Sequence, residues 1–342
     1  MRKIDNFYSN NFDLLRLISA IFVLVSHCYE LLNKLAFEPL YFASSGLLRF
    51  STVGLYSFFF ISGYLVSRSF YKTESVKLFV WKRFLRIYPA LIFTVIITVF
   101  IIAPAFTNET LTAYFLNIGT YKYLVTISGL KIEYFLPGVF QNIKHTDHGV
   151  NGSLWSISLE LKLYISLILF ASVNRPRKKI LCIIPLILSI IFTCLVQINY
   201  WHLQNSFDEL HCRLIIIFFI GYVCSVYYRS FYINWTRLLI LLFTYFLSLI
   251  YFNSFRFIIE PFFFAFLILQ ISYLLPVQKL TMDISYGIYI YAFLVTQLVL
   301  EIYRFINPVS LILIVMLVVF PLSIFSWTFI ESRALKYKSK PL

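Results

Sequence analysis

Charged side chains are scarce in this sequence. Of its 342 residues only 13% are Asp, Glu, Lys or Arg, whereas 60% are hydrophobic. A water-soluble fold carries about 25% charged residues, because it needs a polar surface to face solvent. A soluble globular domain is therefore excluded, and the solvent of most of the chain must be a lipid bilayer.

Acidic residues are the scarcer of the two signs. The sequence holds 15 Asp and Glu against 29 Lys and Arg, which leaves a net charge of +14. In a chain this hydrophobic, the excess is typical of basic loops that face an anionic cytoplasmic leaflet. We therefore expect the lipid bilayer, and no nucleic acid, among the partners of this protein.

Paired cysteines are also missing. The five cysteines form no Cys-x-x-Cys pair and all but Cys212 lie inside apolar runs, so neither a zinc site nor a disulfide framework is predicted. His145, Asp147 and His148 cluster before Asn151, but their spacing does not match zinc sites. We expect a solvated entrance or a substrate-contacting surface there, with no bound metal and no permanently bound cofactor.

Long hydrophobic runs dominate what is present. A helix needs about 20 mainly apolar residues to cross a hydrocarbon core about 30 Å thick. Ten windows meet this condition, so the sequence predicts an all-α fold, a polytopic transmembrane helix bundle of about ten spans. The windows lie near residues 13–32, 46–67, 87–106, 153–173, 180–199, 212–228, 236–252, 256–275, 284–303 and 309–330.

The distribution of basic residues predicts an orientation. Most Lys and Arg fall on one side when the N-terminus is placed in the cytoplasm, so we expect both termini there. The long connection on the other side, residues 107–150, is too short for a useful soluble domain. We therefore expect residues 1–342 to form one membrane-embedded domain without an appended soluble domain.

Ionisable residues in the first window are functional candidates, because each costs a few kcal/mol in a membrane. Arg16 and His27 are eleven residues apart, which places them on one helix face about 16 Å apart along the axis. Asp13 and Glu30 lie near the same stripe. An interhelical hydrogen-bonding histidine with a snorkelling arginine explains the pattern equally well.

Two further polar patterns stand out. Ser153, Ser156 and Glu160 form a stripe at the start of the fourth window; Glu160 is a candidate partner of His27, or of a buried Lys or Arg. Arg83 and Arg86 project from one side of a helix start, an arrangement that suits paired hydrogen bonds to phosphate. Anchoring to lipid headgroups is the commoner role of such basic clusters.

Six fragments in the right order resemble the bacterial acyltransferase-3 family of integral membrane O-acyltransferases. The resemblance covers nearly the whole chain and includes an Arg followed after ten residues by a His, an Arg-x-x-Arg motif and an NGSLWS element. The fragments are Phe12-Asp13-Leu14-Leu15-Arg16 leading to Ser26-His27, residues 58–65, Arg83-Phe84-Leu85-Arg86, Asn151 to Ser156 with Glu160 and Tyr164, Ser285 to Tyr289, and Phe329-Ile330-Glu331.

The sequence also departs from the family pattern. Many members have His where this chain has Ala292, so His27 must carry any histidine chemistry within the bundle. Lys162 stands where Gln is frequent, and Glu331-Ser332-Arg333 lacks the usual Glu-Arg-Pro ending. Some relatives carry a C-terminal esterase-like domain, whereas this chain resembles the stand-alone type.

The resemblance implies a transferase in the bacterial cytoplasmic membrane. Its expected reaction moves an acyl group, most simply acetyl from acetyl-CoA, to a sugar hydroxyl. The expected acceptor is a cell-surface polysaccharide such as the O-antigen of lipopolysaccharide, or its polyprenyl-linked precursor. Transfer of another short acyl group, such as succinyl, is the alternative to transfer of acetyl.

The resemblance also implies roles for individual residues. Arg83 and Arg86 would hold CoA phosphates, and Arg16 would assist the donor along its path. His27 would act as general base or carry a transient acyl group, with Glu160 orienting its ring. The residues expected to contact substrate are Asn151, Trp155, Ser156 and Tyr286.

Two other classes of protein fit parts of the pattern. A saccharide or lipid transporter or flippase would use Arg16, His27 and Glu160 as a proton relay. It is disfavoured by the lack of an internal repeat and of paired Gly/Pro-broken helices. A non-catalytic subunit of a polysaccharide export complex would tolerate loss of the His27 imidazole.

Overall fold

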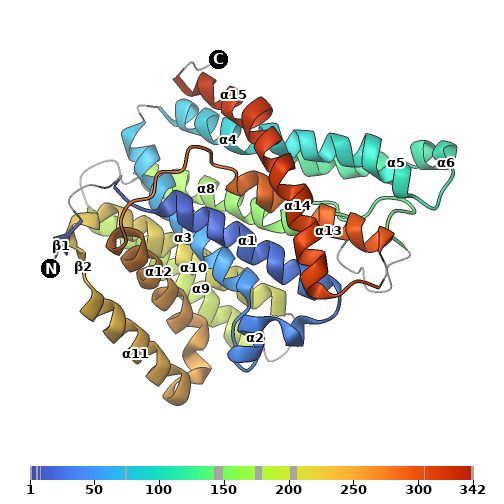
Figure 1. Cartoon of the computed structure of the whole chain (residues 1–342). Helices are drawn as coiled ribbons and strands as arrows, with labels where there is room; N and C mark the ends of the chain where they lie inside the picture. Colours follow the sequence, from blue (N-terminus) through green and yellow to red (C-terminus); the bar gives the residue numbers. More distant parts are fainter. Residues whose placement is uncertain are drawn as a thin grey trace. The chain divides into compact units, whose positions relative to one another are not determined.

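The computed structural model describes residues 2–4, 7, 9–73, 75–141, 149–173, 179–200, 206–303 and 305–339. Regular structure in these residues is almost entirely helical, which confirms the predicted all-α fold (Figure 1). The described strands are β1 (Arg2–Lys3) and β2 (Tyr232–Ile233), which pair antiparallel with Arg2 opposite Ile233.

Nine helical segments of the described chain are long and apolar enough to cross a bilayer, so this is a multi-pass membrane protein. Five are single helices: α1 (Phe12–Leu31), α3 (Phe50–Lys72), α10 (Ser206–Val226), α12 (Arg256–Leu274) and α13 (Ser285–Ile302). The other four are composite, and the first is α4 (Val76–Ile97), continued by a π-helical turn (Thr98–Ile102) and α5 (Ala103–Phe106). In the next two, a 3-10 turn (Gly152–Leu154) leads into α8 (Trp155–Val173), and a 3-10 turn (Lys179–Ile183) leads into α9 (Ile184–Tyr200). The last is α14 (Pro308–Ser326), followed by a π-helical turn (Trp327–Glu331), α15 (Ser332–Leu335) and a final 3-10 turn (Lys336–Ser339).

The seventh predicted window also forms a helix, but a shorter one. Helix α11 (Trp235–Tyr251) has 17 residues, which makes it about 26 Å long. Asn234 caps its start, because the Asn234 side chain accepts a hydrogen bond of 2.7 Å from the backbone N–H of Arg237. Short helices occupy the connections: α2 (Pro39–Ala43), α6 (Leu111–Leu116) and α7 (Ile118–Lys122).

The chain divides into two compact units. The first comprises residues 1–19, 52–76 and 163–281, and the second comprises residues 20–51, 77–162 and 282–342. Helices α1 and α8 continue from one unit into the other. The expectation of one membrane-embedded domain stays a prediction.

Close backbone approach and buried charge hold the first unit together. A Cβ atom on Gly63 of α3 would lie 2.0 Å from the carbonyl oxygen of Phe218 on α10, so only glycine permits this contact. Helix α10 lies beside α9 and α12, and α12 lies beside α11 (Figure 1). Between α10 and α12, Arg213 and Arg256 both bind the fully buried carboxylate of Glu260.

Helix α13 is the buried centre of the second unit. It runs along α14 (Figure 1), and the two backbones are close enough that a Cβ on Gly287 would lie 3.0 Å from the Cα of Ser323. It also contacts the 3-10 turn that precedes α8. Most of its side chains are buried, including Tyr289 and Tyr291. Polar groups of α1, α4 and α8 contact these buried surroundings of α13.

Candidate active site

The His27 imidazole lies in the second unit between a carboxylate and an aromatic ring. Its Nδ1 atom is 3.3 Å from Oε2 of Glu30, one turn later on α1. Its ring centroid is 5.0 Å from that of Phe293 on α13, in an edge-on arrangement. The His27 side chain is only 12% exposed. Neighbours on two helices thus restrict the imidazole.

The contact with Glu30 determines which nitrogen of the His27 imidazole carries the lone pair that can accept a proton. We assign the proton to Nδ1, which faces the carboxylate, because a carboxylate accepts hydrogen bonds. The lone pair is then on Nε2. Sequence reasoning placed Glu30 near the Arg16–His27 stripe but gave it no role. The i, i+3 spacing of His27 and Glu30 on one helix is the sequence signal that indicates this pair.

A second carboxylate anchors the connection between α1 and α3. The Glu38 side chain is fully buried and accepts hydrogen bonds from the backbone N–H of Phe50 (2.5 Å) and from Ser26 Oγ (3.2 Å). Burial raises the pKa of the Glu38 carboxyl, and these two hydrogen bonds and the charge of Arg49 oppose that rise. Because Ser26 precedes His27, this network fixes the end of α1 that carries the imidazole.

Arg49 connects the two carboxylates. Its Nη1 atom is 3.8 Å from Oε1 of Glu30, and its charge also acts on Glu38. The Arg49 side chain is 42% exposed, so its pairing with Glu30 is partly screened by solvent. Neither Glu38 nor Arg49 was singled out from the sequence.

The NGSLWS element is hydrogen-bonded to α13. Asn151 Nδ2 donates to the backbone oxygen of Ile290 (3.0 Å), and Ser153 Oγ donates to Asn151 Oδ1 (2.9 Å). The Tyr289 hydroxyl donates to the backbone oxygen of Ser153 (2.9 Å) and also pairs with Ser156. Asn151 and Ser156 are buried and hold this turn against α13. Contact of Asn151, Trp155 or Ser156 with substrate stays a prediction.

Gly152 links this element to His27. A Cβ atom on Gly152 would lie 2.8 Å from Cζ of Phe293, the ring that packs against His27. The absence of a side chain at Gly152 therefore leaves the space that the Phe293 ring occupies. One motif glycine sets the position of the aromatic wall beside the imidazole.

Glu160 lies near tyrosines of α13. Its charge acts on both Tyr286 and Tyr289, and Tyr286 also interacts with Arg86 and with buried Glu331. The Tyr286 hydroxyl donates to the backbone oxygen of Ile87 on α4 (2.9 Å). The carboxylate that faces His27 Nδ1 is Glu30, so the orientation of His27 by Glu160 remains only a prediction.

Arg86 is held by a carboxylate. Its Nη2 atom lies 2.5 Å from Oδ2 of Asp283, whose other oxygen accepts a hydrogen bond of 2.6 Å from Ser285. Asp283 is 197 residues away in the sequence, and no local pattern indicated it. The pair fixes the guanidinium of Arg86 at the start of α13.

Lys338 lies near three cations of α4. The charges of Lys82, Arg83 and Arg86 all act on Lys338, which comes from the C-terminal turn. That turn is fastened to α4 by a hydrogen bond of 3.2 Å from Trp81 Nε1 to the backbone oxygen of Tyr337. We call Lys82, Arg83, Arg86 and Lys338 the basic cluster. Its arrangement favours binding of an anion with several phosphates.

Arg16 lies on α1 with His27, as the spacing predicts. Its Nη1 atom is 3.8 Å from Oδ1 of Asp13, and its side chain is 20% exposed. Arg16 belongs to the first unit and His27 to the second. A role for Arg16 in the donor path stays a prediction.

The proposed loop cluster of His145, Asp147 and His148 lies outside the described residues, as does His202. Within the part of the chain that the structure describes, no group of three or more His, Cys, Asp or Glu side chains is placed to hold a metal ion. His211 lies on α10 in the first unit.

Comparison with known proteins identifies the chain. The model of an acyltransferase domain family matches residues 9–328. The chain belongs to this acyltransferase family. The acyltransferase is 29% identical to an O-acetyl transferase of Shigella phage Sf6 over 339 residues, which cover 98% of both chains. It is 31% identical to nodulation protein 10 of Rhizobium leguminosarum bv. viciae over 175 residues, which cover 50% of this chain and 47% of that protein. No solved structure matched it.

Proposed function

We propose that this acyltransferase transfers an acetyl group from acetyl-CoA to a hydroxyl of a saccharide. The observation that carries the proposal is the imidazole of His27, held by Glu30 and Phe293 within the membrane-spanning part of a family acyltransferase. The name of the phage relative, an O-acetyl transferase, supports acetyl as the group and oxygen as the acceptor atom. The sequence resemblance supports a surface polysaccharide or its polyprenyl-linked precursor as the acceptor.

His27 acts as the general base. A sugar hydroxyl attacks the thioester carbonyl of acetyl-CoA while Nε2 of His27 accepts the hydroxyl proton. The tetrahedral intermediate collapses, the C–S bond breaks, and His27 returns the proton to the departing sulfur. The products are an acetyl ester and free CoA. Glu30 stabilises the imidazolium that forms between the two proton transfers, as the acidic member of a catalytic triad does.

The basic cluster holds the donor. CoA carries several phosphates, and guanidinium groups bind phosphate oxygens through paired hydrogen bonds. Asp283 reduces the net charge of the cluster but fixes the fork of Arg86, so the donor meets a preorganised site. Lys338 adds a flexible cation from the C-terminal turn. Because acetyl-CoA is a cytoplasmic donor, this proposal requires the basic cluster to face the cytoplasm from the bacterial cytoplasmic membrane.

The test is acetyl transfer by the purified protein in nanodiscs. Radiolabelled acetyl-CoA and a lipid-linked saccharide acceptor are supplied, and label in the saccharide is measured. His27→Gln is expected to lower kcat about 10²-fold or more, because a positioned general base contributes about 10²–10⁴-fold. His211→Gln, on α10 of the first unit, is the matched control.

Two results would contradict the proposal. Normal label transfer by a correctly inserted His27→Gln protein would remove the base assignment. Movement of unmodified saccharide across the membrane, without label transfer, would identify a transporter instead.

A further inference from the structure

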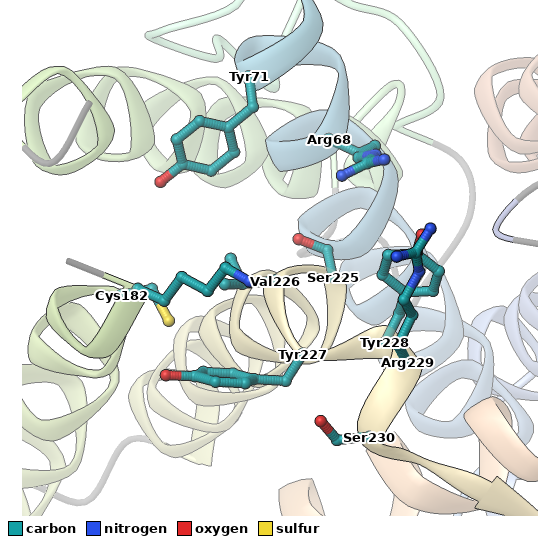
Figure 2. Close-up of a pocket in the computed structure, with 10 residues that line it drawn as sticks. Arg68, Tyr71, Cys182, Ser225, Val226, Tyr227, Tyr228, Arg229 and Ser230 are labelled. Carbon is teal, nitrogen blue, oxygen red and sulfur yellow. The ribbon is translucent and has the colours of Figure 1, made fainter. Parts of the chain in front are cut away.

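A cavity of about 400 Å³ lies in the first unit, apart from the residues discussed so far. Its volume is within the range of about 300–1,000 Å³ that is typical of small-molecule sites. Figure 2 shows Arg68 and Tyr71 of α3 on one side, and Tyr227, Arg229 and Ser230 on the other. Lys179 completes the polar lining. None of these residues belongs to the basic cluster.

The cavity is positively charged. Arg68, Lys179 and Arg229 line it, and the described residues of its lining include no Asp or Glu. Among the described residues, none of these three cations forms an ion pair with a carboxylate, in contrast to Arg86, Arg213 and Arg256. Three cations around one cavity repel each other, and an anion between them removes that repulsion.

Two of the cations are held in place by aromatic rings. The guanidinium of Arg68 lies 5.3 Å from the ring centroid of Phe7 and 5.5 Å from that of Tyr228. Arg229 lies 5.6 Å from the same Tyr228 ring and donates from Nε to its hydroxyl (3.0 Å). The Nε atom of Arg68 is buried without a hydrogen-bond partner among the described residues. The aromatic rings hold the two guanidinium groups in position, and both guanidinium groups retain N–H groups that can bind an anion.

The cavity lies where three membrane spans end. Arg68 and Tyr71 are in the last turns of α3, Lys179 is the first residue of the span that continues as α9, and Arg229 follows the end of α10. The ends of spans are the depth at which lipid phosphates and water meet. Tyr71 and Tyr227 have the mixed apolar and polar character that suits this depth.

We propose that this cavity binds a phosphate group, carried by an anionic membrane lipid or by a soluble phosphate ester. Arg68 and Arg229 supply paired hydrogen bonds from fixed positions, and Lys179 supplies a mobile point charge at the rim. The site is independent of the acetyl-transfer reaction, because none of its residues takes part in the proposed chemistry.

Native mass spectrometry of the full-length protein in detergent tests the proposal. The lipid probe is phosphatidylglycerol, and diacylglycerol with the same acyl chains is the matched lipid without phosphate. The soluble probe is sn-glycerol 3-phosphate, measured by titration calorimetry. Wild-type protein is expected to bind phosphatidylglycerol at least tenfold more tightly than diacylglycerol.

Single substitutions locate the binding. Arg229→Gln and Lys179→Gln are each expected to weaken phosphatidylglycerol binding roughly tenfold, because each removes a charge-assisted hydrogen bond. Lys179 is exposed, so its substitution leaves the fold intact even if Arg229→Gln does not fold. Arg237→Gln is the control, because Arg237 also stacks on a tyrosine but lies outside the cavity.

The two probes separate the two sources of phosphate. Binding of phosphatidylglycerol alone, reduced by Lys179→Gln, supports a lipid headgroup. Binding of glycerol 3-phosphate with the same loss in the variants supports a soluble ester. Equal binding of phosphatidylglycerol and diacylglycerol, or variants that bind like wild type or like Arg237→Gln, would overturn the proposal.

Discussion

Glu30 determines whether the His27 imidazole presents a usable lone pair. Glu30→Gln keeps the size of the side chain but removes the charge that favours the imidazolium, and an amide can turn its N–H₂ towards Nδ1. We expect kcat to fall at least tenfold while the KM for acetyl-CoA changes little, because the donor phosphates bind elsewhere. Steady-state kinetics with labelled acetyl-CoA measures both values.

An equal loss of kcat in Glu160→Gln alone, with Glu30→Gln unaffected, would reverse the assignment. Glu160 would then be the carboxylate that orients His27, which is one of the two roles that the sequence leaves open for it. Both variants keep side-chain size, so each serves as the structural control of the other.

Glu38 makes stability depend on pH. Burial raises its pKa in the folded protein above the usual value near 4.5, so the folded state binds the proton more tightly than the unfolded state. The contribution of Glu38 to stability is therefore complete below its unfolded pKa and is lost as pH rises through the folded value. Each unit of pKa difference corresponds to about 1.4 kcal/mol.

Glu38→Gln removes this titration. The variant is expected to gain stability relative to wild type as pH rises from 4 to 7, because only wild type must ionise a buried carboxyl. Thermal unfolding in detergent across that range checks the sign. A stability difference that is constant with pH would show that Glu38 has the same pKa in both states.

At the scale of elements, the turn before α8 and helix α13 act together. Gly152→Ala would press on the Phe293 ring, which in turn contacts His27. Overpacking of this kind costs about 1–3 kcal/mol. We expect reduced stability and reduced kcat, and we expect Phe293→Leu in the same chain to restore the thermal stability. Unfolding temperatures and label transfer measure the two effects, and failure of Phe293→Leu to restore stability would exclude the predicted clash.

The elements and the site differ in how far the sequence predicts them. Every predicted window contains a helix, although the second helix begins at Phe50 and not at residue 46, because the length and hydrophobicity of a span are local properties. Arg16 and His27 share α1 for the same reason. The Arg86–Asp283 pair joins residues 197 apart, and Lys338 joins the cluster from the C-terminal turn. Such contacts depend on tertiary packing, which no spacing rule records.

At the scale of the whole molecule, the contact between Trp81 and Tyr337 constrains the topology. Strand β1 pairs with β2, so the start of α11 lies on the same side as the N-terminus. We expect α1 and α3 to return the chain to that side before Trp81 of α4, and Tyr337 near the C-terminus accepts a hydrogen bond from Trp81. The chain is then expected to cross the membrane an even number of times after β2. We therefore expect α11 to cross with α12, α13 and α14.

Labelling with a membrane-impermeant maleimide tests this topology. Single cysteines replace exposed Trp235 and exposed Ser254 in a chain without its native cysteines. They are expected to react from opposite sides, with position 235 on the cytoplasmic side. A C-terminal fluorescent-protein fusion is expected to fluoresce. Reaction of both cysteines from one side would show that α11 does not cross.

A crossing by α11 has a consequence for the surrounding lipid. The helix is about 4 Å shorter than a typical hydrocarbon core, and exposed aromatic rings, Trp235 and Tyr251, stand at its two ends. Such rings prefer the depth of the lipid headgroups, so the bilayer must become thinner beside α11. The acyl-chain length of the host membrane therefore affects the free-energy cost of hydrophobic mismatch around the protein, and with it the membrane regions in which the protein accumulates.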